Sequence, residues 1–290
     1  MLNTLFLLSS LVFCSKSSPL EGDISLDSIP TKKAVQPLIN EASGIADSKR
    51  NKGYLWVQED SGNPAQLILL GHDGNVKKTI QIAGTRNIDW EDMVLAGGDI
   101  YLGDIGDNFR INTSGTIYKF PEPSMTVDTV NTVETIRFFY PDGSHDAEAF
   151  LVDPLTKDIF IITKKEMPSR IYKISYPYKL TDLNKATAVG TLTYNWVVSA
   201  ALSPDTKTIL VKTYAGIMSY QRTGKESLDK VLQHTPKKEH FQNQFIRQKE
   251  VLDELGHDIR QHEQLIINAI KNLNPIQAEK GKFEDHGKDS

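Results

Sequence analysis

A repeated unit of short apolar stretches is the feature of this sequence that most restricts its fold. Segments of similar pattern begin at Glu41, Asp89, Asp146 and Val198, at intervals of about 50 residues. In each segment an apolar stretch leads through a polar turn into a second stretch rich in β-branched and aromatic residues, as in paired β-strands. A third apolar stretch follows in every unit, and candidate fourth strands lie near residues 76–84, 133–141 and 186–195.

Several short antiparallel strands in every ~40 to 50 residues are typical of a β-propeller blade. The sequence therefore predicts an all-β fold, a β-propeller with about four legible blades over residues 37–232. A β-sandwich is the alternative, because it also contains many short strands joined by regular turns. The propeller accounts better for strand ends of matched composition, because its innermost strands run in one direction around a single axis.

The N-terminal residues have the composition of an export signal. The apolar stretch Leu5–Phe13 is too short to span a bilayer but suits the core of a signal peptide. Cys14, the only cysteine in the sequence, follows this stretch and precedes a polar linker over residues 15–36. We expect residues 1–14 to be a lipoprotein-type signal with Cys14 as the lipidated residue. An ordinary signal peptide or a misplaced start codon are the alternatives.

This expectation places the protein outside the cytoplasm, in the cell envelope or periplasm, with membrane contact only through a lipid anchor. A single cysteine excludes a disulfide within one chain. The formal net charge of -4 and the scattered lysines and arginines provide no basic surface for nucleic acid. We therefore expect no nucleic-acid partner.

The C-terminal residues change to a helical pattern. Apolar residues recur with seven-residue spacing at Phe245, Leu252, Ile259, Ile266 and Leu273. We expect residues 233–290 to form an α-helical tail with a disordered end. Two explanations stay open: a helical hairpin or coil replaces further blades, or the reading frame is altered or truncated there. Because an unclosed propeller leaves exposed strand edges, a cap or a partner is expected.

One region carries a resemblance to a known family. The segment "NIDWEDMVLAGGDIYLGDIGDNFR", with "SGIA" before it and "DAEAFLVDP" after it, resembles exported bacterial proteins with TolB-like propellers, which usually have six blades. The resemblance extends over roughly Leu38 to Leu232 and is more distant to phytase-like propellers. It implies a propeller fold and export, and the C-terminal tail departs from it.

Acidic and amide side chains recur where the expected strands begin and end. In a blade, the start of the innermost strand and the end of the second strand lie on the same face, so these side chains should converge. Calcium takes about six to eight oxygen ligands from carboxylates, carbonyls and water. The candidate cation ligands are Asp89, Glu91, Asp104, Asp107 and Glu148. The alternative is a structural role, because Asp and Asn side chains also cap backbone amides in turns.

Basic residues in the same turns are candidates for contact with an anionic ligand. These are Arg110, just after "GDIGDN", and the pair Lys164 and Lys165. Trp56 and Trp90 are expected to pack in the core between blades. The sequence contains no G-x-S-x-G or H-E-x-x-H motif and no Walker or dinucleotide glycine motif.

Two functions follow from these patterns. The first is a noncatalytic binding or scaffold module of the cell envelope, whose acidic face binds calcium and an unidentified ligand or envelope protein. The alternative is a calcium-dependent phosphoesterase of phytase-like type. In that case the metal polarises a phosphoryl oxygen, and Arg110, Lys164 and Lys165 neutralise the phosphate charge.

Overall fold

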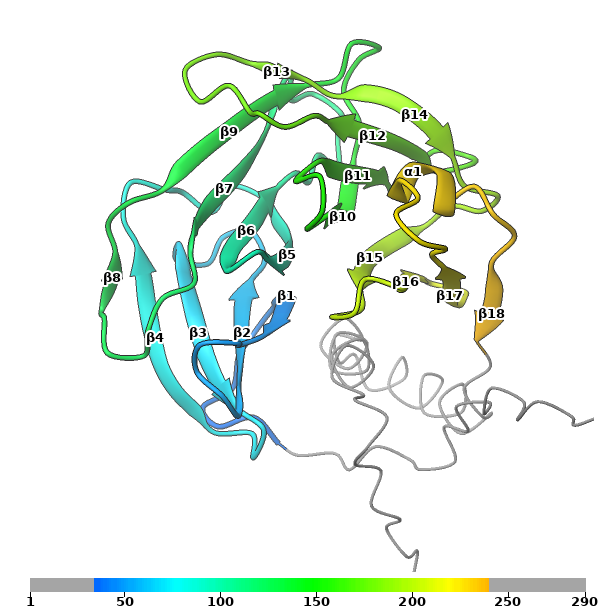
Figure 1. Ribbon diagram of the computed structural model, residues 1–290. Coiled ribbons are helices and arrows are strands. Elements are labelled where there is room, and N and C mark those ends of the chain that lie inside the picture. Colours follow the sequence, from blue (N-terminus) through cyan, green and yellow to red (C-terminus); the bar gives the residue numbers. More distant parts are fainter. Residues whose placement is uncertain (1–33, 240–290) are drawn as a thin grey trace, which may run out of the picture. The chain divides into compact units, whose positions relative to one another are not determined.

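The computed structural model describes residues 34–239, which form an all-β fold with one short helix. The strands assemble into four sheets that lie side by side around one axis, as in a β-propeller (Figure 1). The innermost strands are β1 (Ala42–Asp47), β5 (Trp90–Ala96), β10 (Ala147–Val152) and β15 (Val197–Leu202). Each contacts the next in sequence order. Within the described residues, the expected four-blade propeller is confirmed.

Each sheet continues outward by antiparallel pairing. The first sheet adds β2 (Tyr54–Glu59), β3 (Gln66–Gly71) and β4 (Val76–Ile82). The second adds β6 (Asp99–Asp104), β7 (Gly115–Pro121) and β9 (Glu134–Phe139). The third adds β11 (Ile159–Thr163), β12 (Arg170–Ile174) and β14 (Thr187–Thr191). The fourth adds β16 (Thr208–Thr213), β17 (Gly216–Gln221) and β18 (Lys237–Glu239).

In the second, third and fourth sheets, the link between the third and fourth strands contacts the preceding sheet. In the second sheet this link contains β8 (Thr129–Val130), which pairs in parallel with β4 of the first sheet. In the third sheet it contains β13 (Asn184–Lys185), which pairs in parallel with β9. In the fourth sheet it contains α1 (Leu228–Val231), which lies against β14. We call these segments the latches.

The hydrophobic core lies in layers between neighbouring sheets and follows the two-residue period of the strands. On β6, Ile100 and Leu102 pack against the first sheet, whereas Tyr101 packs against the third. Trp56 and Trp90 are fully buried in the layer between the first and second sheets, as expected. Sheets buried on both faces explain why the strands read as nearly continuous apolar stretches.

Several expectations concern residues outside the described range. The signal peptide, Cys14, most of the polar linker and nearly all of the expected helical tail belong to residues 1–33 and 240–290. The tail was expected to begin at residue 233. The structure instead places β18 (Lys237–Glu239) in the fourth sheet, where it pairs with β17. Within residues 34–239, no helix has the length and apolar character needed to cross a bilayer.

Candidate metal centre

The strand register brings together the two kinds of strand end that carry the acidic side chains. In every sheet, the first residue of the innermost strand lies opposite a residue at the end of the second strand: Ala42 and Glu59, Trp90 and Asp104, Ala147 and Thr163, Val197 and Thr213. The loops that enter the innermost strands and leave the second strands therefore share one face of the propeller. We call it the acidic face.

Each innermost strand has an irregularity in its register directly after this first pair. In β5 and β10 the residue at the irregularity is a glutamate, Glu91 and Glu148 respectively. A β-bulge leaves one residue unpaired and changes the direction of its side chain. Two glutamates thus occupy equivalent positions in neighbouring sheets, and the charge of Glu148 contributes to raising the pKa of Glu91.

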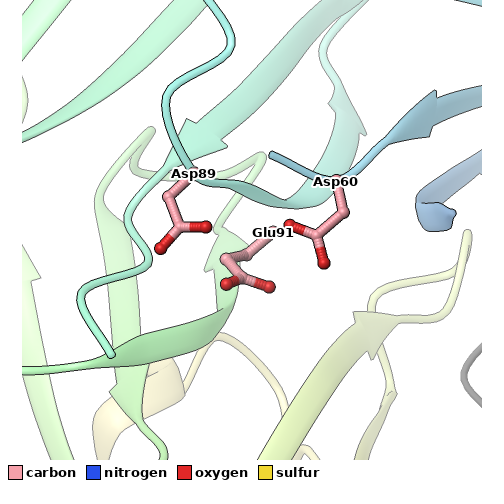
Figure 2. Close-up of side chains that lie close together, drawn as sticks. All are labelled: Asp60, Asp89 and Glu91. Atoms are coloured by element: carbon pink, nitrogen blue, oxygen red, sulfur yellow. The ribbon is translucent and has the colours of Figure 1, made fainter. Parts of the chain in front are cut away.

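Three carboxylates converge on the acidic face between the first and second sheets. Asp60 directly follows β2, Asp89 directly precedes β5, and Glu91 lies on β5. One oxygen atom from each lies within 4.8 Å of the others. Figure 2 shows the three side chains gathered in one place. Asp60 and Glu91 are buried, and Asp89 is partly exposed. We call this group the carboxylate cluster.

Gly106 completes the wall of the carboxylate cluster. A Cβ atom at this position would lie 2.3 Å from Asp89 Oδ2 and 2.5 Å from Glu91 Oε1. The Gly106 N–H donates to the Asp89 carbonyl at 3.2 Å, which holds the backbone in this place. Only a residue without a side chain allows the backbone to approach both carboxylates so closely. The glycine in "GDIGDN" therefore leaves space for the cluster.

The carboxylate cluster gathers buried acidic groups, and the charge of Lys164 offsets their mutual repulsion only in part, because the pKa of Glu91 stays well above its usual value. Burial, together with the charges of Glu148 and Asp60, raises the pKa of Glu91 well above its usual value. Burial and the charge of Asp60 also raise the pKa of Asp89. Among residues 34–239, no ion pair joins Asp89 or Glu91 to a basic side chain. Clustered carboxylates with raised pKa values are typical of functional sites.

Two of the expected cation ligands interact with backbone amides. Asp104 Oδ1 accepts the Asp89 N–H at 2.8 Å, and burial raises the pKa of the Asp104 carboxyl to about 6. The Asp107 oxygens accept the N–H groups of Ile111 and Asn112 at 3.0 and 2.8 Å, which caps the loop after β6. The carboxylate cluster contains Asp89 and Glu91 from the expected set, but neither Asp104 nor Asp107.

The fifth expected ligand and the three basic candidates form ion pairs with one another or with nearby carboxylates. Glu148 pairs with Lys164. Lys165 Nζ lies 2.8 Å from Asp146 Oδ2, and Arg110 lies 3.5 Å from Glu166. The acidic face therefore already provides a carboxylate to each of the basic side chains that were candidates for an anionic ligand.

Asp60 is the residue of the cluster that the sequence analysis did not select as a ligand. The sequence did indicate its position on the acidic face, because Asp60 directly follows the second strand of its unit. Ile105 and Lys164 occupy the same place in the next two sheets. The "DSGN" pattern that contains it is also a good turn former, and the Asp60 Oδ1 atom indeed accepts the Ser61 N–H at 2.6 Å.

A second polar network lies on the same face in the third sheet, and sequence patterns did not reveal it. His145 Nδ1 lies 2.8 Å from Glu166 Oε1, and His145 Nε2 lies 2.8 Å from the Tyr172 hydroxyl. Tyr172 in turn donates to Asp142 at 2.7 Å. The network connects the loop before β10 to the loop after β11. Tyr172 lies on β12, whereas Asp142, His145 and Glu166 lie in the loops, and the four residues have no common spacing in the sequence.

Comparison with known proteins gives only distant similarities. No family model and no curated protein matches the sequence. Among solved structures, an auxiliary nutrient binding protein from Bacteroides thetaiotaomicron matches with a TM-score of 0.43 and 11% identity, over 69% of this chain and 42% of that chain. A protein of unknown function from Desulfotomaculum acetoxidans matches with a TM-score of 0.38 and 14% identity, over 69% of this chain and 55% of that chain.

A protein from Bacteroides fragilis described as exported matches with a TM-score of 0.38 and 12% identity, over 68% of this chain and 51% of that chain. The chain thus spans about half the length of these structures. At such distances the similarities carry no function from those proteins to this one. Site chemistry is the basis for a functional assignment here.

Proposed function

We propose that this protein is a noncatalytic binding module of the cell envelope whose acidic face binds a divalent cation of the calcium type. The observation that carries the proposal is the carboxylate cluster, in which oxygens of Asp60, Asp89 and Glu91 lie within 4.8 Å of one another. Calcium prefers carboxylate oxygens and fills its remaining positions with carbonyls and water. Zinc fits less well, because the cluster contains no histidine or cysteine.

The electrostatics of the cluster support the same proposal. Burial raises the pKa of both Asp89 and Glu91, and repulsion by the charge of Asp60 raises both further, so the charged forms of the two carboxyls are unfavourable in the fold. A divalent cation would remove this repulsion. Gly106 fits the same proposal, since a Cβ atom at this position would lie 2.3 Å from Asp89 Oδ2 and 2.5 Å from Glu91 Oε1 and would force the two carboxylates out of the cluster.

The contacts of the basic residues favour binding over phosphate-ester hydrolysis. Lys164, Lys165 and Arg110 would have to leave Glu148, Asp146 and Glu166 before they could neutralise a phosphate. The phosphoesterase alternative therefore requires a rearrangement that the binding function does not. A screen of generic phosphate esters with calcium present tests it directly, and turnover that depends on Glu91 would replace the present proposal.

Calcium-dependent thermal unfolding of the purified protein tests cation binding. Calcium at about 100 times its dissociation constant stabilises the native state by about 2.7 kcal/mol, which corresponds to a rise in Tm of about 5 to 10 °C. The rise should disappear in Asp89→Asn and Glu91→Gln. It should persist in Glu226→Gln, a control in the link before α1. Absence of a calcium-induced rise in the unmodified protein would contradict the proposal.

Export and anchoring are the remaining parts of the proposal, and they rest on the sequence around Cys14 and on the resemblance to TolB-like exported propellers. If Cys14 carries the lipid, the full-length protein should fractionate with membranes and incorporate labelled fatty acid. The Cys14→Ser variant should lose the label and be released into the soluble fraction. Membrane association that is equal in both proteins would contradict lipid anchoring at this residue.

A further inference from the structure

A set of large apolar side chains is exposed on the loops of the acidic face, outside the carboxylate cluster. The set consists of Ile88, Phe109, Ile111, Met167, Trp196 and Tyr214. Phe109, Met167 and Ile111 are 85%, 84% and 74% exposed, the highest values for large apolar side chains among residues 34–239. Single exposed apolar side chains are common on protein surfaces, whereas a gathered group marks an interaction surface.

The loops that carry this set are joined to one another by hydrogen bonds. Lys165, after β11, donates to the Asn108 side-chain oxygen at 2.8 Å and so connects the loop after β11 to the loop after β6. The Trp196 N–H donates to the Lys164 carbonyl at 2.8 Å, and the Tyr214 N–H donates to the Trp196 carbonyl at 3.3 Å. These bonds join the loops after β6, after β11, before β15 and after β16 into one arc across the second, third and fourth sheets, and the Ile105 N–H, which donates to the Asp89 carbonyl at 3.2 Å, adds the loop that carries Ile88. We call the exposed apolar side chains on these loops the apolar rim.

The backbone of the apolar rim is strained where it presents two of its apolar segments. Trp196 has a φ of 59° and Arg110, between Phe109 and Ile111, has a φ of 55°. Non-glycine residues rarely adopt positive φ, and such strain gathers at ligand-contacting positions. The Trp196 side chain stays 42% exposed and packs beside Tyr214, with ring centroids 5.8 Å apart.

The charge of the acidic face selects the kind of partner. Asp and Glu outnumber Lys and Arg in the loops of this face, and the basic Arg110, Lys164 and Lys165 are already paired with carboxylates. One bound divalent ion therefore leaves the face acidic. An acidic face attracts a basic protein segment and is repelled by anionic lipid headgroups.

We infer that the apolar rim and the carboxylates of the acidic face together bind a protein partner, through a segment in which a basic side chain is flanked by apolar side chains. Apolar and aromatic anchors supply most of the affinity in such interfaces, and charge complementarity supplies orientation and selectivity. In this complex the apolar residues of the partner pack on Phe109, Met167 and Trp196. Its basic residue lies toward the carboxylates. The inference rests on the proposed binding function and adds the class of partner.

Binding of short synthetic peptides to the purified full chain tests this inference. The probes are three matched sets labelled for fluorescence anisotropy: basic with apolar flanks, the same peptides with glutamate in place of the basic residue, and the same peptides with serine in place of the apolar residues. The basic and apolar set should bind at least about tenfold more tightly than the other two.

Matched variants place this binding on the apolar rim. Phe109→Ser and Met167→Ser should each weaken it about tenfold, because they remove apolar contact area. Leu155→Ser and Leu180→Ser change exposed apolar residues away from the acidic face and should leave it unchanged. Equal binding of all three peptide sets, or equal loss in rim and control variants, would overturn the inference.

Two further measurements distinguish this inference from binding to a lipid surface and from the proposed cation site. Sedimentation with phosphatidylcholine and phosphatidylglycerol vesicles tests a lipid surface, and vesicle binding that depends on Phe109 and Met167 would replace the protein partner by a membrane. Calcium titration of the rim variants should match that of the unmodified protein. Loss of peptide preference with intact calcium binding overturns only this inference, whereas peptide preference without calcium binding overturns only the cation site.

Discussion

The carboxyl group of Asp104 shows how one buried acid couples the acidic face to stability. It lies at the end of β6, accepts the Asp89 N–H, and has its pKa raised from 3.8 to about 6 by burial. Because the folded state holds this proton more tightly than the unfolded state, the contribution of Asp104 to the free energy of unfolding is greatest below about pH 4 and is lost as the pH rises from about 4 to about 6. Charged Asp104 is thus a cost to the fold at neutral pH.

Replacing Asp104 by asparagine should remove this pH dependence while keeping an oxygen that accepts the Asp89 N–H. In calcium-free buffer, we expect the unfolding free energy of Asp104→Asn to exceed that of the unmodified protein at pH 7.5 by about 2 to 3 kcal/mol more than it does at pH 4. Urea denaturation at the two pH values measures it. The exposed control Asp205→Asn should not gain stability between them, and a parallel response of both variants would refute the argument.

The raised pKa values of Asp89 and Glu91 also predict the pH dependence of calcium binding. A cation must displace the protons that these carboxyls hold more tightly than usual, so affinity should increase as the pH rises. At pH values below the pKa of a carboxyl that must lose its proton, each displaced proton should weaken binding by up to about tenfold per unit of decreasing pH. Isothermal titration at several pH values measures this, and an affinity independent of pH would argue against the cluster as the site.

At the scale of elements, the loop after β6 has two separate tasks. Asp107 caps its backbone, whereas Gly106 lets the backbone lie directly against the Asp89 and Glu91 carboxylates. Gly106→Ala should therefore weaken calcium binding about tenfold or more, because its Cβ would push Asp89 away. Gly97→Ala, in the turn between β5 and β6, is the matched control: it has a φ of 61° but no atom within 4 Å of an added Cβ. It should lose some stability and keep its calcium affinity; equal affinities in both variants would contradict the role of Gly106.

At the same scale, each latch ties its own sheet to the preceding sheet. In β13, Asn184 donates to the carbonyls of Arg137 and Lys179 at 2.9 Å and accepts the Lys179 N–H at 2.9 Å. Asn184→Ala leaves these backbone groups without partners and should lower the unfolding free energy by about 2 to 3 kcal/mol. Lys185→Ala, at the exposed neighbouring position, should change it by less than about 0.5 kcal/mol. Similar values from denaturant unfolding of the two variants would show that the latch is dispensable.

At the scale of the whole molecule, polar joints connect the sheets on the face opposite the acidic one. Glu122, which follows β7, accepts hydrogen bonds from Ser48 and Trp56 of the first sheet. At the corresponding place after β17, Arg222 pairs with Asp153 of the third sheet, with nitrogen to oxygen distances of 3.2 and 2.7 Å. Both side chains of that pair are buried, so each depends on the other for neutralisation.

Removal of one partner from this joint should loosen the fourth sheet. Asp153→Ala leaves a buried guanidinium without its counter-charge and should lower the unfolding free energy by about 3 to 5 kcal/mol. The exposed control Asp205→Ala should change it by less than about 1 kcal/mol. Thermal or urea unfolding measures both. A loss below about 1 kcal/mol in Asp153→Ala would mean that the apolar layers alone hold the sheets together.

The sequence by itself determined the sheets, because strand pairing leaves a local signal. The consecutive apolar residues Ile100, Tyr101 and Leu102 and the polar turns that flank such stretches lie within a few residues of one another, and the same unit recurs about every 50 residues. The same regularity was enough to predict that strand starts and second-strand ends share one face. The short latches had no such signal, because two-residue strands such as Thr129–Val130 form only where the preceding sheet offers an edge.

Only the tertiary structure decided which acidic side chains converge. Asp60, Asp89, Asp104 and Asp107 are alike in sequence, each at a strand end or in a turn. Asp104 and Asp107 turn to backbone amides, whereas Asp60 and Asp89 approach Glu91. That choice depends on the register shift in β5, on the close approach of Gly106 to the carboxylates and on the backbone N–H groups that lie within reach of Asp104 and Asp107. These contacts join residues that are distant along the chain, and they form only when the sheets pack against one another.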